Sequence, residues 1–175
     1  MVRPDPYQLE EEALYLGALA ATGIKPLSRI EYPVSPAVLD RFAAWGLVVA
    51  SVTRFARDGT RCRHLILSRQ PALIAAYRAR FDRTVIAGET PAVVRCEARF
   101  FGYPACCAEA FIQAPYGPND LAPDEQGLLF HHACPGCRVT PRLLLRYRTA
   151  LAWARRQHRL LRGCSDRDMI LSPLR

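Results

Sequence analysis

Four cysteines, arranged in two pairs, are the residues of this sequence whose types and spacing could do chemistry. Cys134 and Cys137 enclose two residues, the second of them Gly136, and this spacing lets both thiolates face one metal ion. A second pair, Cys106 and Cys107, lies upstream, and four thiolates would complete a tetrahedral or cluster site. The sequence therefore predicts one metal centre held by Cys106, Cys107, Cys134 and Cys137.

The spacing leaves the identity of the metal open between an iron–sulfur cluster and zinc. Neighbouring residues on a helix point about 100° apart, so Cys106 and Cys107 could share one small ion only at a distorted helix start. Pro104 places them near such a start, but a multi-iron cluster, with separate metal atoms, fits adjacent thiolates more easily. The Cys-Pro-Gly-Cys segment is instead typical of structural zinc sites. A metal-free dithiol and four thiols that only fill the core are the other interpretations.

Two adjacent histidines precede the second cysteine pair and are the best candidates for catalysis. His131 or His132 could replace one cysteine as a ligand, or could act as an acid–base group beside the centre. The alternative is a solvated pair at the end of a loop. Glu109, Asp120 and Asp124 could supply carboxylates, although each has the position of an ordinary helix-surface or turn residue.

The chain has seven cysteines, an odd number that argues against a fully paired disulfide framework. Clustered cysteines are typical of metal or redox sites in a reducing compartment. The N-terminus lacks the pattern of a signal peptide, and no apolar run is long enough to cross a membrane. We therefore expect a cytoplasmic protein with no membrane segment, in which Cys62, Cys96 and Cys164 are structural thiols.

Proline, glycine and capping residues mark the ends of the expected elements and predict a mostly helical chain. Asp5 and Asp58-Gly59 are the clearest signals, for a helix start and for a hairpin turn. The expected helices are 6–21, 36–45, 71–81, 91–101, one that starts near 104, and 140–161. The expected strands are 47–55 and 61–67, and the segment 115–127 reads as a loop.

These elements predict an α+β fold, a mostly helical single domain with a small β-hairpin and a cysteine-ligated metal site. Residues 1–88 would form an α+β region with the hairpin, and residues 89–175 a cysteine-rich helical metal-binding region within one compact domain. Two helices followed by a basic hairpin could also make a winged helix. We take the ordinary α+β layer as the prediction.

The net charge of +8 is concentrated at the C-terminal end. The stretch 138–175 holds ten arginines against Asp166 and Asp168, which accounts for the whole excess. On the expected last helix a buried face would carry Leu143, Tyr147, Ala150, Ala154 and Leu161. A separate arginine stripe could contact nucleic acid or an acidic partner, or could be only a solvated face. The arginine stripe consists of Arg148, Arg155, Arg159 and Arg162.

The cysteine segments resemble a known pattern. From Gly102 the chain reads Gly-Tyr-Pro-Ala-Cys-Cys and continues to Phe111, and His131 precedes the second cysteine pair. This is similar to an uncharacterised, mainly archaeal family with a Gly-Tyr-Pro-x-Cys-Cys segment and a downstream His-x-x-Cys-x-x-x-Cys-type segment, although Cys137 comes one residue early. The resemblance covers residues 99–148 and implies that the cysteines form one functional set, without an assigned reaction. A looser motif similarity to proteins that hold an unusual four-iron cluster with a Cys-Cys element and a C-x-x-C implies that cofactor.

Two functions follow as hypotheses. In the first, the metal–thiolate centre serves redox or sulfur chemistry in an enzyme, or in an enzyme component of a biosynthetic pathway. It predicts a pocket bordered by His131, His132 and the 115–127 loop. In the second, zinc stabilises a binding module that acts through the arginine stripe. An accessory protein that needs the metal only to fold is a third interpretation.

Overall fold

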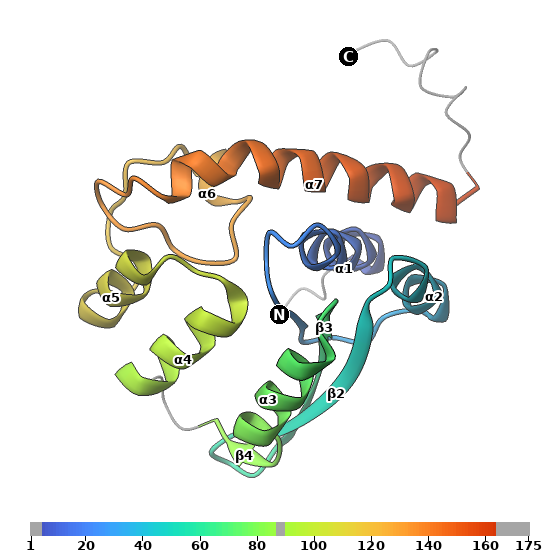
Figure 1. The fold of residues 1–175 in the computed structure, drawn as a ribbon, viewed down its shortest axis with the longest axis horizontal. Coiled ribbons are helices and arrows are strands. Elements are labelled where there is room, and N and C mark those ends of the chain that lie inside the picture. The colour runs from blue at the N-terminus through green and yellow to red at the C-terminus, as the bar shows by residue number, and fades with distance from the viewer. Residues whose placement is uncertain (1–4, 87–89, 164–175) are drawn as a thin grey trace.

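The computed structural model describes residues 5–86 and 90–163 and has the predicted α+β fold, mostly helical, with a small sheet (Figure 1). The helices are α1 (Pro6–Ala21), α2 (Pro36–Ala44), α3 (Pro71–Phe81), α4 (Pro91–Phe101), α5 (Ala105–Gln113), α6 (Pro123–Gln126) and α7 (Thr140–Leu161). The strands are β1 (Ser28–Ile30), β2 (Val48–Phe55), β3 (Arg61–Ser68) and β4 (Thr84–Val85). Within the described residues no helix is long and apolar enough to cross a membrane.

The predicted hairpin forms the centre of a four-stranded sheet. Strands β2 and β3 pair antiparallel from Val48 opposite Ser68 to Phe55 opposite Arg61. The strand order is β1-β3-β2-β4, with β4 parallel to β2, so the hairpin has a neighbour on each side. The hairpin is therefore part of an α+β layer and is not a protruding wing. The edge strands β1 and β4 were not predicted because three and two residues are too short to show a periodic pattern.

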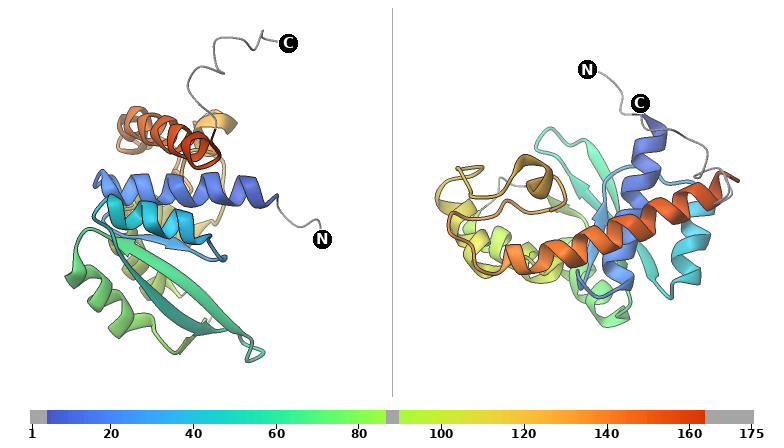
Figure 2. Two further views of the ribbon diagram at one scale, coloured as in Figure 1. Left: turned by 90° about the vertical axis from the view of Figure 1, so that its right-hand side faces the viewer. Right: turned by 90° about the horizontal axis from the view of Figure 1, so that it is seen from above.

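The helices lie in layers around the sheet. Helices α1 and α2 cover one face, α3 covers the other, and α7 lies across the outer side of α1 (Figure 2). The main core joins α1 to α7 through buried residues such as Leu14, Leu19, Tyr147 and Ala154. The regions 1–88 and 89–175 thus share a core, and the division between them stays a prediction.

Two of the predicted helix starts, those of α1 and α4, have side-chain capping bonds in the structure. The carboxylate of Asp5 accepts a hydrogen bond from the Tyr7 N–H at 3.0 Å, and the Thr90 hydroxyl accepts one from the Val93 N–H at 3.4 Å. Ser35 precedes α2 without a side-chain capping bond. Two details differ from the predictions. The predicted 115–127 loop contains the one-turn helix α6, and the last helix buries Leu144, with Leu143 and Leu161 only partly covered.

A tight turn at Gly102 sets the position of α5 relative to α4 and to the segment after α1. Gly102 has a left-handed φ of 69°, and a Cβ there would lie 2.6 Å from Cδ of Pro26. The Tyr103 N–H donates to the Ala98 carbonyl at 2.8 Å, and Pro104 then precedes the first turn of α5. Only glycine allows both this φ and this close approach.

We expect Gly102→Ala to destabilise the protein more than Gly59→Ala. Gly59 at the hairpin tip also has a positive φ, 84°, but a Cβ there would meet no atom within 4 Å. Gly59→Ala, the control, should therefore lower the free energy of unfolding only by the cost of a left-handed φ at a residue with a Cβ, about 1–2 kcal/mol. Gly102→Ala should lose about 1–3 kcal/mol more because Pro26 must move. Urea denaturation measures both, and equal losses would show that the contact with Pro26 is unimportant.

Candidate metal centre

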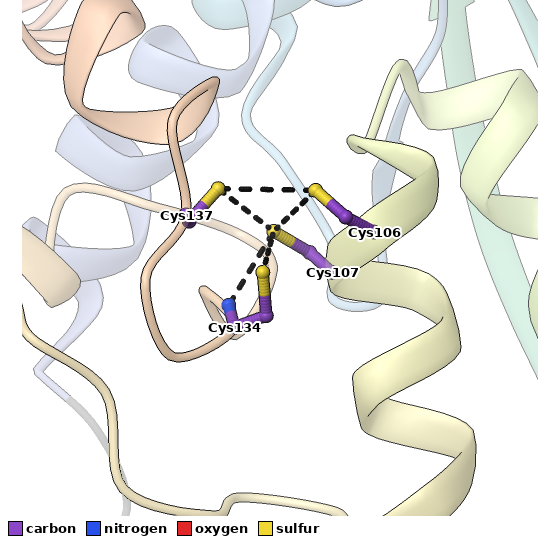
Figure 3. A group of neighbouring side chains, drawn as sticks. All are labelled: Cys106, Cys107, Cys134 and Cys137. Atoms are coloured by element: carbon purple, nitrogen blue, oxygen red, sulfur yellow. Dashed lines mark hydrogen bonds between the residues drawn. The ribbon is translucent and has the colours of Figure 1, made fainter.

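The four predicted cysteines lie together, with their sulfur atoms all within 4.8 Å of one another (Figure 3). Sγ of Cys107 is 3.5 Å from that of Cys137, 3.8 Å from that of Cys134 and 4.0 Å from that of Cys106. Sγ of Cys106 is 3.9 Å from that of Cys137. Among the described residues this is the one group of at least three cysteine, histidine or carboxylate side chains that could hold a metal ion.

Each cysteine pair is positioned by a local structure that its neighbours dictate. Cys106 and Cys107 occupy the first turn of α5, directly after Pro104. The second pair sits in a turn closed by the Cys137 N–H, which donates to the Cys134 carbonyl at 3.2 Å. Gly136 has a φ of 63° in this turn, and its N–H donates to the Asp120 carboxylate at 2.6 Å. Sγ of Cys106 and Sγ of Cys107 lie 4.0 Å apart in this first turn, next to the helix start as predicted from Pro104.

Thr140 holds the sulfur atoms from the first residue of α7. Its backbone N–H donates to Sγ of Cys137 at 3.3 Å, and its hydroxyl oxygen lies 3.3 Å from the same sulfur and 3.5 Å from Sγ of Cys107. The Cys134 N–H donates to Sγ of Cys107 at 3.5 Å. The sulfur atoms therefore lie at the N-terminal ends of both α5 and α7, where helix dipoles favour negative charge.

The thiols differ in acidity because they differ in burial and in hydrogen-bond donors. Burial raises the pKa of Cys107, and burial together with the neighbouring thiols raises the pKa of Cys134. Burial also acts on Cys137, but hydrogen bonds from Thr140 and from the Val139 backbone outweigh it and lower its pKa to about 6. The protein thus provides a ready thiolate at Cys137, and a bound cation would be needed to ionise Cys107 and Cys134.

His131 lies next to the cysteines without belonging to the group. Its Nε2 is 3.1 Å from the hydroxyl oxygen of Thr140, which in turn contacts two sulfur atoms. Burial, with smaller contributions from Lys25 and His132, lowers the pKa of His131 to about 4, so the imidazole is neutral at physiological pH. Its Nδ1 is buried and makes no hydrogen bond to any residue that the structure describes.

His132 faces the loop that precedes it. Its Nε2 lies 2.6 Å from the Gly117 carbonyl oxygen and 3.1 Å from Nδ2 of Asn119. The short contact is that of an Nε2–H donating to a carbonyl, which leaves this nitrogen no lone pair for a metal. Gln126 fastens the same loop by donating to the His131 carbonyl at 2.8 Å. In this geometry His132 orders the loop, and a catalytic role for either histidine stays a prediction.

The remaining candidates lie outside the group of four. Glu109 forms a two-point ion pair with Arg95 at 2.6 and 2.8 Å, and Asp124 is an exposed residue of α6. Cys62 and Cys96 are free thiols in β3 and α4. Cys164 lies outside the described residues. Asp120 supports the metal-site turn through Gly136, a role that its position in a loop did not reveal.

A cavity of about 350 Å³ adjoins the cysteine group, as the first functional hypothesis predicted. It is bordered by Cys107, both histidines and aromatic residues, among them Phe111 and Tyr116. A small-molecule site of this kind is mostly apolar with a few polar groups. The structure thus places a possible binding site next to the possible metal site.

The arginine stripe of α7 is largely engaged within the chain. The partners are Glu125 for Arg148 at 2.9 Å, Glu11 for Arg155 at 2.9 Å, and the Tyr7 ring for Arg162 at 4.3 Å from its centre. Arg159 has a buried Nε without a hydrogen-bond partner among the described residues. These contacts join α7 to α1 and α6, and contact with nucleic acid or an acidic partner stays a prediction.

No protein-family model matches the chain, and no match was found among curated proteins or solved structures. The resemblance to the archaeal Gly-Tyr-Pro-x-Cys-Cys family therefore stays a hypothesis. Any functional argument rests on the geometry of this chain alone.

We expect Thr140→Val to weaken metal binding by about 10–100-fold, because second-shell hydrogen bonds position the ligands and stabilise their charge. Valine keeps the β-branched shape and the backbone N–H but removes the hydroxyl beside Cys107 and Cys137. Competition with a chromophoric chelator measures the change. Thr149→Val is the matched control, since its hydroxyl only donates to the Leu145 carbonyl at 3.0 Å on the same helix. An affinity unchanged in both variants would contradict this role of Thr140.

Proposed function

We propose that the chain binds one zinc ion through Cys106, Cys107, Cys134 and Cys137, and that this ion is structural. The observation that carries the proposal is the distance between neighbouring sulfur atoms, 3.5–4.0 Å. Four thiolates at about 2.3 Å from a central zinc stand about 3.8 Å apart. Four of the six pairs of sulfur atoms have close to this spacing and all six lie within 4.8 Å, which supports four ligands around one ion.

An iron–sulfur cluster is the less favoured alternative. In a four-iron cluster each cysteine binds a different iron atom, so the ligating sulfur atoms stand farther apart than around a single ion. The argument that adjacent cysteines need separate metal atoms also loses its basis, since Sγ of Cys106 and of Cys107 approach to 4.0 Å in the first turn of α5.

A zinc ion with four thiolates carries two net negative charges, and the surrounding structure suits that charge. The N-terminal ends of α5 and α7 both meet the sulfur atoms, and the Cys134 and Thr140 N–H groups donate to them. Buried charge is tolerated in proteins where such donors compensate for lost water. A reducing compartment such as the cytoplasm would keep these thiols available to the metal.

A structural role follows from the complete ligand set. Four protein ligands fill a tetrahedral zinc shell and leave no position for substrate or water. The ion would fasten α5 to the turn before α7, two segments otherwise joined by a long loop. Redox chemistry at the centre is thereby disfavoured. We assign any enzymatic or ligand-binding function to the cavity beside Cys107, whose walls the metal would hold in place.

Purified protein is expected to contain one zinc per chain and to be colourless, and cobalt exchange should give the absorption bands of a tetrahedral thiolate site. Removing the metal should lower Tm by roughly 10 °C or more, because each kcal/mol shifts Tm by about 2–4 °C in a protein of this size. Metal analysis, absorption spectroscopy and thermal denaturation are the measurements.

The variant Cys134→Ser, with Cys62→Ser as its matched control, tests whether the metal binds at this site. Cys134 belongs to the sulfur group, whereas Cys62 is a free thiol on the hairpin strand β3. The first variant should lose zinc and stability, and the second should keep both. Iron and sulfide in anaerobically purified protein would refute zinc, and retention of a full zinc equivalent by Cys134→Ser would refute the ligand assignment.

A further inference from the structure

Lys25, the single lysine of the chain, is buried, and no carboxylate of the described residues pairs with it. It is 1 % exposed, and no ion pair of Lys25 occurs within residues 5–86 and 90–163. Its Nζ lies 3.3 Å from the Tyr103 hydroxyl oxygen. Three rings surround the amine, with their centres 4.4 Å away for Tyr103, 5.1 Å for Phe130 and 5.3 Å for Phe101.

The position of Lys25 is fixed by the same turn that begins the metal site. The Lys25 N–H donates to the Leu19 carbonyl at 3.0 Å, just past the end of α1. Pro26, the next residue, packs against Gly102, and Tyr103 then reaches the amine. The Tyr103 ring in turn lies 5.1 Å from the His131 ring. The aromatic cage is therefore a rigid, preorganised part of the fold.

Lys25 lines a cavity of about 420 Å³, large enough for a small organic ligand. Arg29, Phe101, Tyr103 and Phe130 line both this cavity and the one beside Cys107, so the two adjoin. Lys25 thus forms part of the wall of a site lined both by aromatic rings and by the charged side chains of Arg29, Glu12 and Glu31.

The charges around Lys25 favour its neutral form. Burial, and secondly the nearby Arg29 guanidinium, lower the pKa of Lys25 to about 7. Tyr103 stays protonated because burial raises its pKa, and His131 is neutral. The acids that line the cavity, Glu12 and Glu31, make no ion pair with the amine within the described residues, and Glu31 pairs with Arg29 at 2.8 Å.

We propose that Lys25 is a reactive amine that binds a small aldehyde or ketone in this cavity as an imine. The nitrogen lone pair attacks the carbonyl carbon, the carbonyl oxygen leaves as water with the two amine hydrogens, and a C=N bond forms. No oxidant or reductant is needed. A desolvated lysine near a second cation has the reactivity that this addition requires.

A purely structural role explains the observations less well. A buried amine without a carboxylate partner among the described residues lowers stability whether it stays charged or gives up its proton, while methionine would fill the same space without that cost. Groups that burial and a neighbouring charge perturb in this way, at the wall of a cavity, are typical of functional sites.

Reductive trapping tests the proposal on the full chain as purified, whatever its metal. Benzaldehyde and cyanoborohydride are added at pH 7, and tandem mass spectrometry distinguishes Lys25 from the N-terminal amine. The matched control is Arg57→Lys, which puts an ordinary amine on the exposed hairpin of the same molecule. At pH 7 about half of Lys25 is neutral but well under 1 % of a surface lysine, so we expect Lys25 to react at least about tenfold faster.

Each outcome decides for or against the proposal. Faster trapping at Lys25, with a rate that levels off above a midpoint near pH 7, supports it. Trapping of the introduced surface amine while Lys25 stays unmodified, or equal rates at the two amines, overturns it. Because zinc content is not part of the readout, failure here is distinguishable from failure of the metal proposal.

The pH dependence of stability gives a second prediction about Lys25. A lysine whose folded pKa is about 7, against 10.5 in the unfolded chain, opposes folding fully below pH 7. As pH rises from 7 toward 10.5 the unfolded chain binds the extra proton, so this penalty fades. Lys25→Met should therefore be more stable than the parent at pH 6, with a smaller difference at pH 9, by urea denaturation. A difference independent of pH would show that Lys25 has an ordinary pKa.

Discussion

The structure depends most on how four sulfur atoms are brought within 4.8 Å of one another. Burial, and secondly the neighbouring thiols, raise the pKa of Cys107 and Cys134, whereas hydrogen bonds from Thr140 and Val139 lower the pKa of Cys137. A bound cation would stabilise the thiolate form of each ligand and offset the free-energy cost of burying their charge. The helix N-termini and the donors from Thr140 suit that charged state, and the four cysteines could therefore hold a metal ion.

The turn at Gly102 couples this centre to the rest of the molecule. Gly102 packs on Pro26, Tyr103 reaches Lys25, and Pro104 starts the helix that carries the first cysteine pair. Substitutions at neighbouring residues that share such contacts have non-additive effects on stability. A metal that fixes α5 therefore also fixes the position of the Tyr103 ring against the lysine.

The elements of the fold were predictable where local chemistry decides them, as at the Asp5 cap and the Asp58-Gly59 turn. The four cysteines were found by type and spacing. Asp120, Thr140 and Lys25 were missed because their roles depend on contacts across 16, 33 and 78 residues of sequence, which no periodicity reports. The one signal available was composition, since a single lysine among 24 basic residues is conspicuous.

The neutral form of Lys25 also follows from the balance of the polar network beneath the cavities. Glu97 pairs with Arg29 at 2.8 Å and with Arg54 at 2.9 Å, and Glu31 pairs with Arg29. Two carboxylates thus offset two guanidinium groups, which are always charged. A protonated Lys25 would add a third positive charge beside these pairs, whereas a neutral amine leaves Glu97 and Glu31 paired with the arginines. Burial of the amine, and secondly the permanent charge of Arg29, therefore lower the pKa of Lys25 and favour loss of its proton.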